Sequence, residues 1–166
     1  MEELIEKIEK LKKELGIPKS ERIAIIITAG YYNDENENYP PHWHTPFEVI
    51  MPVKNGYTAV VGEQHYELRE GDILLICPGI VHELFAPESG ERIIFQPSLS
   101  QIQIRELDLL ISLLRPAVLI TPEEFPDFHP IARRLMMEIK EEYFLCEPYY
   151  ETAIYSRFMR ILVDIG

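Results

Sequence analysis

Two segments decide how this sequence folds: PHWHTPFE at residues 41–48 and GDILLICPGIVH at residues 71–82. Together they contain three of the five histidines of the chain. Three imidazoles and one carboxylate are the groups of chemical interest, and they belong to His42, His44, Glu48 and His82. Ligands of this kind suit a first-row divalent metal ion such as Zn, Ni, Fe or Mn.

The spacing of these four residues fits a β-sheet. Residues i and i+2 of a strand point to the same face, so His42 and His44 can converge on one point while Trp43 points away. A turn after His44 allows Glu48 to begin the next strand. The Pro-Gly turn before His82 allows it to begin a strand that lies antiparallel beside the first. We therefore expect the four side chains to meet at one point.

Short apolar segments alternate with turn signals from residue 47 to residue 96. Asn55-Gly56 is a strong hairpin signal. Strands at this even spacing, with no helices between them, predict an antiparallel sandwich or barrel. An earlier β-branched segment at residues 22–28 is typical of a buried strand. The expected strands of the alternating region are FEVIMPV at 47–53, YTAVV at 57–61, QHYEL at 64–68, ILLIC at 73–77, HELFA at 82–86 and RIIFQ at 92–96.

The two ends of the chain have helical periodicity. Residues 1–20 predict an amphipathic N-terminal helix, because leucine and isoleucine recur at steps of four, three and four. This helix either packs on the surface of its own domain or contacts a partner subunit. Residues 21–100 are expected to form the barrel, and residues 101–166 a helical appendage.

Within the appendage, residues 106–114 predict a short helix, and residues 117–120 are too few to classify. Thr121-Pro122 and His129-Pro130 each have the composition of a helix start. Two amphipathic helices follow, and only a few residues around Cys146-Glu147 join them. This arrangement predicts an antiparallel α-hairpin.

Composition excludes several classes of function. The formal net charge of −12 opposes binding to polyanions, so this chain alone is not expected to bind DNA. Two cysteines provide no disulfide framework and favour a reducing compartment. The N-terminal sequence MEELIEKIEK has no apolar signal-peptide region, and no apolar segment approaches the roughly 20 residues of a membrane span. A soluble, cytoplasmic protein without membrane contact is expected.

The two opening segments resemble the motifs of the cupin family. His42, His44 and Glu48 match the first motif, in which HxH is followed by three or four residues and Glu. Gly71-Asp72 and the Pro-Gly turn before His82 resemble the second. The resemblance implies a jelly-roll β-barrel, with the four residues lining a metal site or a polar effector-binding pocket.

A cupin barrel, a short linker helix and paired amphipathic helices also resemble the N-terminal half of AraC-type transcription regulators. In that family the barrel binds a small effector, the helices dimerise, and a separate helix-turn-helix module binds DNA. The resemblance implies a mainly β fold with C-terminal helices, a small polar effector as partner, and a homodimer. It also implies that any DNA contact is made through a module that this chain lacks.

Two functions from different classes remain at this stage. The first is an effector-sensing and dimerisation domain of an AraC-type regulator, which needs only a polar pocket. The second is a metal-dependent cupin enzyme, such as an oxygenase or isomerase, with one divalent ion on the four ligands. The helical hairpin favours the first function, and the complete ligand set favours the second.

Overall fold

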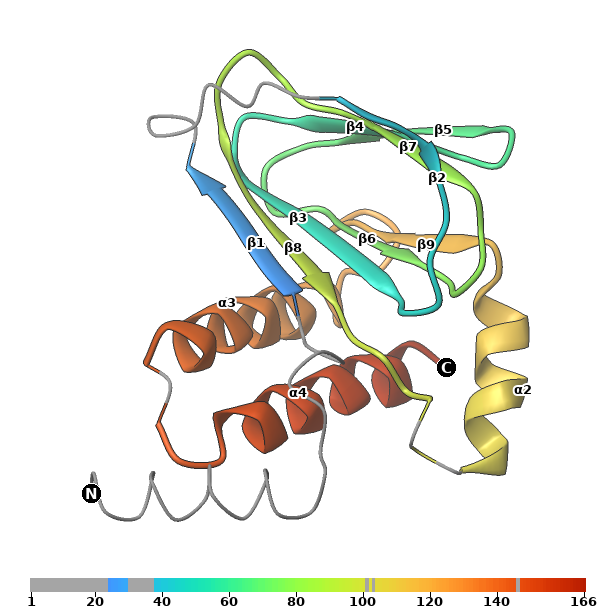
Figure 1. Ribbon diagram of the computed structural model, residues 1–166, viewed down its shortest axis with the longest axis vertical. Helices are drawn as coiled ribbons and strands as arrows, with labels where there is room; N and C mark the ends of the chain where they lie inside the picture. Colours follow the sequence, from blue (N-terminus) through green and yellow to red (C-terminus); the bar gives the residue numbers. More distant parts are fainter. Residues whose placement is uncertain (1–23, 30–37, 101, 103, 146) are drawn as a thin grey trace.

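The chain folds into two facing β-sheets, with helices packed outside one of them (Figure 1). The structure is a computed structural model. It describes residues 24–29, 38–100, 102, 104–145 and 147–166. The helix predicted at residues 1–20 lies outside the described residues.

The first sheet has five strands in the order β1-β8-β3-β6-β9. Every described pair of neighbours in this sheet is antiparallel. Its strands are β1 at Ala24–Ala29, β8 at Glu91–Gln96, β3 at Glu48–Lys54, β6 at Ile73–Ile76 and β9 at Ala117–Ile120.

The second sheet has four strands in the order β2-β7-β4-β5, and its described pairs are also antiparallel. Among the described residues, strand pairing stays within each sheet, so the barrel consists of two layers that face each other. The predicted antiparallel β fold with C-terminal helices is confirmed. The strands are β2 at Tyr39–His42, β7 at His82–Phe85, β4 at Tyr57–Val61 and β5 at Gln64–Leu68.

The five-stranded sheet is covered on both faces. In β3, the first five residues are all buried. Val49 and Met51 belong to the apolar cluster shared with the helices, whereas Ile50 belongs to the cluster between the two sheets. Alternate residues of one strand therefore serve two separate cores.

Three helices follow β8 in the described part of the chain, with β9 between the first and the second. They are α2 at Arg105–Leu114, α3 at His129–Leu145 and α4 at Tyr150–Ile165. Helices α3 and α4 lie side by side beneath the five-stranded sheet (Figure 1).

The fully buried ring of Phe158 on α4 fixes this packing, because it makes edge-to-face contacts with Phe47 and Phe95, each at a centroid distance of 5.5 Å. The apolar faces of α3 and α4 are thus buried against the sheet of the same chain.

The structure classifies one segment that the sequence left open and corrects one local expectation. Residues 117–120 form β9, which pairs with β6 at the edge of the five-stranded sheet. Thr121 does not begin a helix. Its hydroxyl accepts a hydrogen bond from the Glu124 N–H at 3.2 Å, but the chain makes only a turn there and α3 begins at His129.

Candidate functional site

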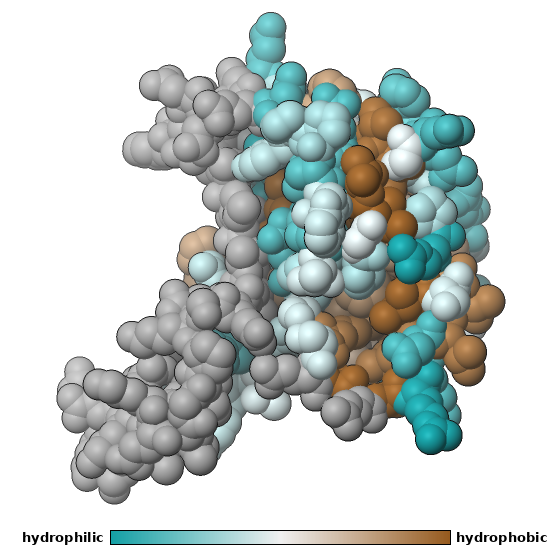
Figure 2. Space-filling model, turned by 45° about the vertical axis from the view of Figure 1, so that its right-hand side comes forward, coloured by the Kyte–Doolittle hydropathy of each residue, from teal (hydrophilic) through white to brown (hydrophobic). Residues whose placement is uncertain are grey.

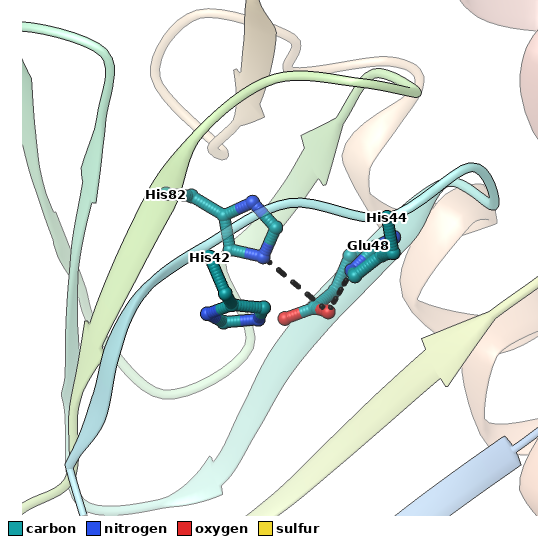
Figure 3. Close-up of side chains that lie close together, drawn as sticks. All are labelled: His42, His44, Glu48 and His82. Atoms are coloured by element: carbon teal, nitrogen blue, oxygen red, sulfur yellow. Dashed lines mark hydrogen bonds and ion pairs between the residues drawn. The ribbon is translucent and has the colours of Figure 1, made fainter.

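Two adjacent strands of the four-stranded sheet position the first pair of histidines. His42 is the last residue of β2, His82 is the first residue of β7, and the two are direct partners in the antiparallel register. Directly opposed residues of such a pair carry their side chains on the same face of the sheet. Both imidazoles consequently face the interior between the sheets (Figure 3).

The loop between β2 and β3 supplies the other two groups. His44 lies just beyond β2, before the bend at Thr45 and Pro46, and Glu48 is the first residue of β3. The loop is held to the turn before β7, because the Gly79 N–H donates a 2.9 Å hydrogen bond to the His44 carbonyl. The site therefore joins both sheets.

The four side chains predicted from the sequence lie together, and we call them the His/Glu cluster. One ligand atom from each residue lies within 4.8 Å of every other. The Oε2 atom of Glu48 is 2.8 Å from Nε2 of His44 and 3.7 Å from Nε2 of His82. Glu48 and His82 are buried and His42 and His44 are half-buried, so the cluster is reached from the side of His42 and His44.

Backbone carbonyl oxygens hydrogen-bond the Nδ1 atoms of all three imidazole rings and so fix the orientation of the rings. The Nδ1 atoms of His42, His44 and His82 lie 2.8, 2.9 and 2.9 Å from the carbonyl oxygens of residues 40, 46 and 80. A carbonyl oxygen can only accept, so each Nδ1 carries the proton. Each Nε2 is therefore the atom that faces the cluster, as in histidines that bind metal ions.

The charge state follows from these contacts. Both ring nitrogens of His44 face acceptors, and its hydrogen bond to Glu48 raises the pKa of His44 although burial opposes this. Burial alone would raise the pKa of Glu48, but hydrogen bonds from His44 and Gln96, together with nearby His82, lower it to about 2. Below the raised pKa of His44, the metal-free pair is an imidazolium beside a carboxylate.

The cluster fits a divalent cation. Two of its buried polar atoms, Glu48 Oε1 and His82 Nε2, have no hydrogen-bond partner among the described residues. Zinc ligands lie about 2.0–2.2 Å from the ion in a tetrahedral arrangement, so their ligand atoms are roughly 3.4 Å from one another. The observed separations require only a small closure, and a cation would satisfy both atoms.

Gln96 is a member of the site that sequence reasoning missed. Its side-chain amide donates a 2.7 Å hydrogen bond to Glu48 Oε2. The signal was the alternation in RIIFQ, which places Arg92, Ile94 and Gln96 on one face of β8. The sequence could not indicate which strand this face would meet.

The other residues considered do not join the cluster. Trp43 points away, as predicted, and its side chain is 63% exposed. His65 is exposed on β5. His129 is buried at the start of α3, where its Nε2 atom hydrogen-bonds the Gly71 carbonyl at 2.8 Å. A surface hollow over β4, β5 and the end of β7 includes Arg69 and carries none of the cluster residues.

The fold is that of an AraC-type ligand-binding domain. Residues 25–142, more than half of the chain, match the model of the AraC-like ligand binding domain. The chain belongs to this family. No curated protein sequence matches the chain.

Several solved structures are similar to the chain at low sequence identity. An apo variant of ToxT from Vibrio cholerae matches 86% of this chain and 55% of its own chain, with a TM-score of 0.54 and 10% identity. A cupin protein from Bacteroides fragilis matches 57% of this chain and 78% of its own, with a TM-score of 0.38 and 15% identity. Oxalate decarboxylase from Bacillus subtilis, a protein with Mn(II) centres, matches 70% of this chain and 33% of its own chain, with a TM-score of 0.37 and 17% identity.

In the described ranges, no helix is both long and apolar enough to cross a membrane.

Proposed function

We propose that this domain senses a small polar effector in the interior between its two sheets, with one divalent metal ion held by the His/Glu cluster as part of the effector site. The observation that carries this proposal is the convergence of three Nε2 atoms and one carboxylate within 4.8 Å. Backbone carbonyls orient the rings beforehand, so little rearrangement is required on binding.

His42, His44, Glu48 and His82 would hold the ion. When bound, a divalent cation supplies a Lewis-acidic contact for an oxygen or nitrogen of the effector. Gln96 keeps Glu48 Oε2 in place through its 2.7 Å hydrogen bond. The two half-buried histidines leave the approach to the cluster open, whereas buried Glu48 and His82 close it from behind.

Dimerisation and DNA regulation are further parts of this proposal. The faces of α3 and α4 that pack on the sheet are occupied, but Leu109 and Leu113 on α2 are 69% and 80% exposed. Figure 2 shows hydrophobic residues gathered beside hydrophilic ones on the side of the molecule where α2 comes forward. We assign the exposed face of α2 to a homodimer contact. Because this chain is acidic, we assign DNA binding to a separate module. The regulator as a whole is proposed to be cytoplasmic.

The metal proposal is tested with His44→Ala and with His65→Ala as the matched control. Purified proteins are offered Zn, Ni, Fe and Mn in turn, and bound metal is measured by elemental analysis. Wild type and His65→Ala should retain about one ion per chain, and His44→Ala should lose most of it while its β-rich circular dichroism is kept. A wild type that retains none of the four metals would disprove the metal site.

A metal-dependent cupin enzyme is the second candidate, and the completeness of the ligand set favours it. The two functions differ in what the ion does. An effector bound without chemical change, recovered intact from the protein, supports the sensor. A metal-dependent conversion of the bound molecule, lost in His44→Ala, would favour the enzyme instead.

A further inference from the structure

Arg92 is a buried cation inside the barrel. It lies on β8 opposite Pro52 of β3 in the register, and only 6% of it is exposed. Its Nε atom has no hydrogen-bond partner, and no ion pair involves its guanidinium among the described residues. Removing a charge from water without a partner is costly, so buried cations are almost always paired.

Tyr57 lies beside Arg92 and has an unused donor as well. The Arg92 guanidinium carbon is 4.8 Å from the centre of the Tyr57 ring, a cation–π contact. Tyr57 is 3% exposed, and its hydroxyl has no partner in the described part of the chain. Burial raises the pKa of Tyr57 to about 12, with Arg92 opposing the shift, so the phenol keeps its proton at neutral pH.

These two donors lie at a different place in the interior from the His/Glu cluster. Arg92 and Gln96 share one face of β8 and are four residues apart, which is roughly 13 Å along a strand. Ile94 lies between them on the same face, and the neighbouring apolar side chains are Ile50 and Leu84. The interior thus has two polar ends with an apolar region between them.

The unpartnered atoms at the two ends have opposite characters. Across the described residues, four buried side-chain atoms have no hydrogen-bond partner, and two of them belong to the cluster. The other two, Arg92 Nε and Tyr57 Oη, both donate hydrogen bonds. Arg92 is positively charged and can only donate, and the Tyr57 hydroxyl beside it can donate as well, so an anion satisfies both groups.

We propose that Arg92 and Tyr57 form an anion subsite that holds the carboxylate of a small organic acid in the barrel interior. The planar guanidinium fork matches a carboxylate, and one cation balances one negative charge. The hydrocarbon part of the acid lies along Ile94 and its apolar neighbours, and points toward the His/Glu cluster. This inference rests on the proposed effector-sensing function and specifies the chemical class of the effector.

Calorimetry with paired acids and amides tests the subsite. Acetate, butyrate and hexanoate are each titrated beside the corresponding uncharged amide into wild type, Arg92→Met, Arg92→Lys and Tyr57→Phe. Lys54→Met is the matched control, because it removes an exposed cation from the neighbouring strand β3.

In wild type and in Lys54→Met, hexanoate should bind at least tenfold more tightly than hexanamide. Arg92→Met should abolish this preference, and both Arg92→Lys and Tyr57→Phe should reduce it. Equal binding of acid and amide by wild type, or an acid preference that persists in Arg92→Met, would overturn the subsite. Neither result changes the metal content of the cluster, so the proposed metal function is judged separately.

Thermal unfolding without any ligand gives a second test. A buried guanidinium whose only partner is a ligand contributes little to the stability of the ligand-free protein. Arg92→Met should therefore have a Tm equal to or above that of wild type. A clear fall in the Tm of Arg92→Met, with Lys54→Met unchanged, would assign Arg92 a structural role and remove the proposal.

Discussion

The two faces of the five-stranded sheet are built from the same strands but have different chemistry. The face toward α3 and α4 is apolar, and Phe47 and Phe95 meet Phe158 there. The face toward the four-stranded sheet carries Glu48 and Gln96 among its aliphatic residues. Consecutive residues of one strand thus contribute alternately to stability and to binding. A substitution on one face of the sheet should therefore leave the property of the other face unchanged.

The largest expected effect is on the helix-facing side. Phe158→Ala removes a fully buried ring that contacts two other phenylalanines, so it should lower the free energy of unfolding by about 3–5 kcal/mol. Urea unfolding followed by circular dichroism measures this loss. Metal content per folded chain should stay unchanged, because the cluster is on the other face.

Phe144→Ala is the matched control for that substitution, since the Phe144 ring is 61% exposed on α3. Its effect should remain within about 0.5 kcal/mol. If Phe158→Ala removed the metal from protein that is still folded, the two faces would not be independent.

The second-largest expected effect is the pH dependence of metal affinity at the His/Glu cluster, on the face of the sheet toward the barrel interior. Metal binding must displace the proton of His44, whose pKa is raised, whereas Glu48, with a pKa of about 2, is already ionised. Affinity should therefore fall at least about tenfold for each unit that pH drops below the pKa of His44, because protons also compete for the Nε2 atoms of His42 and His82. Metal titrations between pH 5 and 8 measure this slope, and a constant affinity would contradict the assignment of His44.

The smallest effect on stability is expected outside both faces, on α2. Leu113→Glu changes a side chain that is 80% exposed, so the free energy of unfolding should move by less than about 0.5 kcal/mol. The proposed homodimer should nevertheless dissociate to a 19.4 kDa species in light scattering over a concentration series. Leu145→Glu, exposed on α3, is the control and should remain dimeric. A wild type that is monomeric at every concentration would disprove the dimer.

Much of the barrel could be predicted from the sequence because its signals are local. Strand alternation and turn residues predicted β4 and β5 with their observed bounds. The same alternation predicted that His42 and His44 would converge, and the Pro-Gly turn predicted that His82 would begin a strand beside them. The strand bounds follow from local backbone geometry, whereas the meeting of His42 and His82 also requires the pairing of β2 with β7.

The remaining features depend on contacts between distant parts of the chain. β9 has only four residues and is stabilised by pairing with β6, more than 40 positions earlier in sequence. His129 is buried because the Gly71 carbonyl accepts its hydrogen bond. Thr121 does form a capping-type hydrogen bond, but no amphipathic helix continues from it. Local composition cannot distinguish these outcomes.

The two-faced construction of β8 has a mechanical consequence. Gln96 hydrogen-bonds Glu48 inside the barrel, and the residue before it, Phe95, contacts Phe158 on α4. A single rigid peptide unit joins these two residues. A displacement that a ligand imposes on Gln96 should therefore reach the helix layer across one residue. Glu48 in the cluster and its neighbour Phe47, which also contacts Phe158, provide an equally short covalent path to α4.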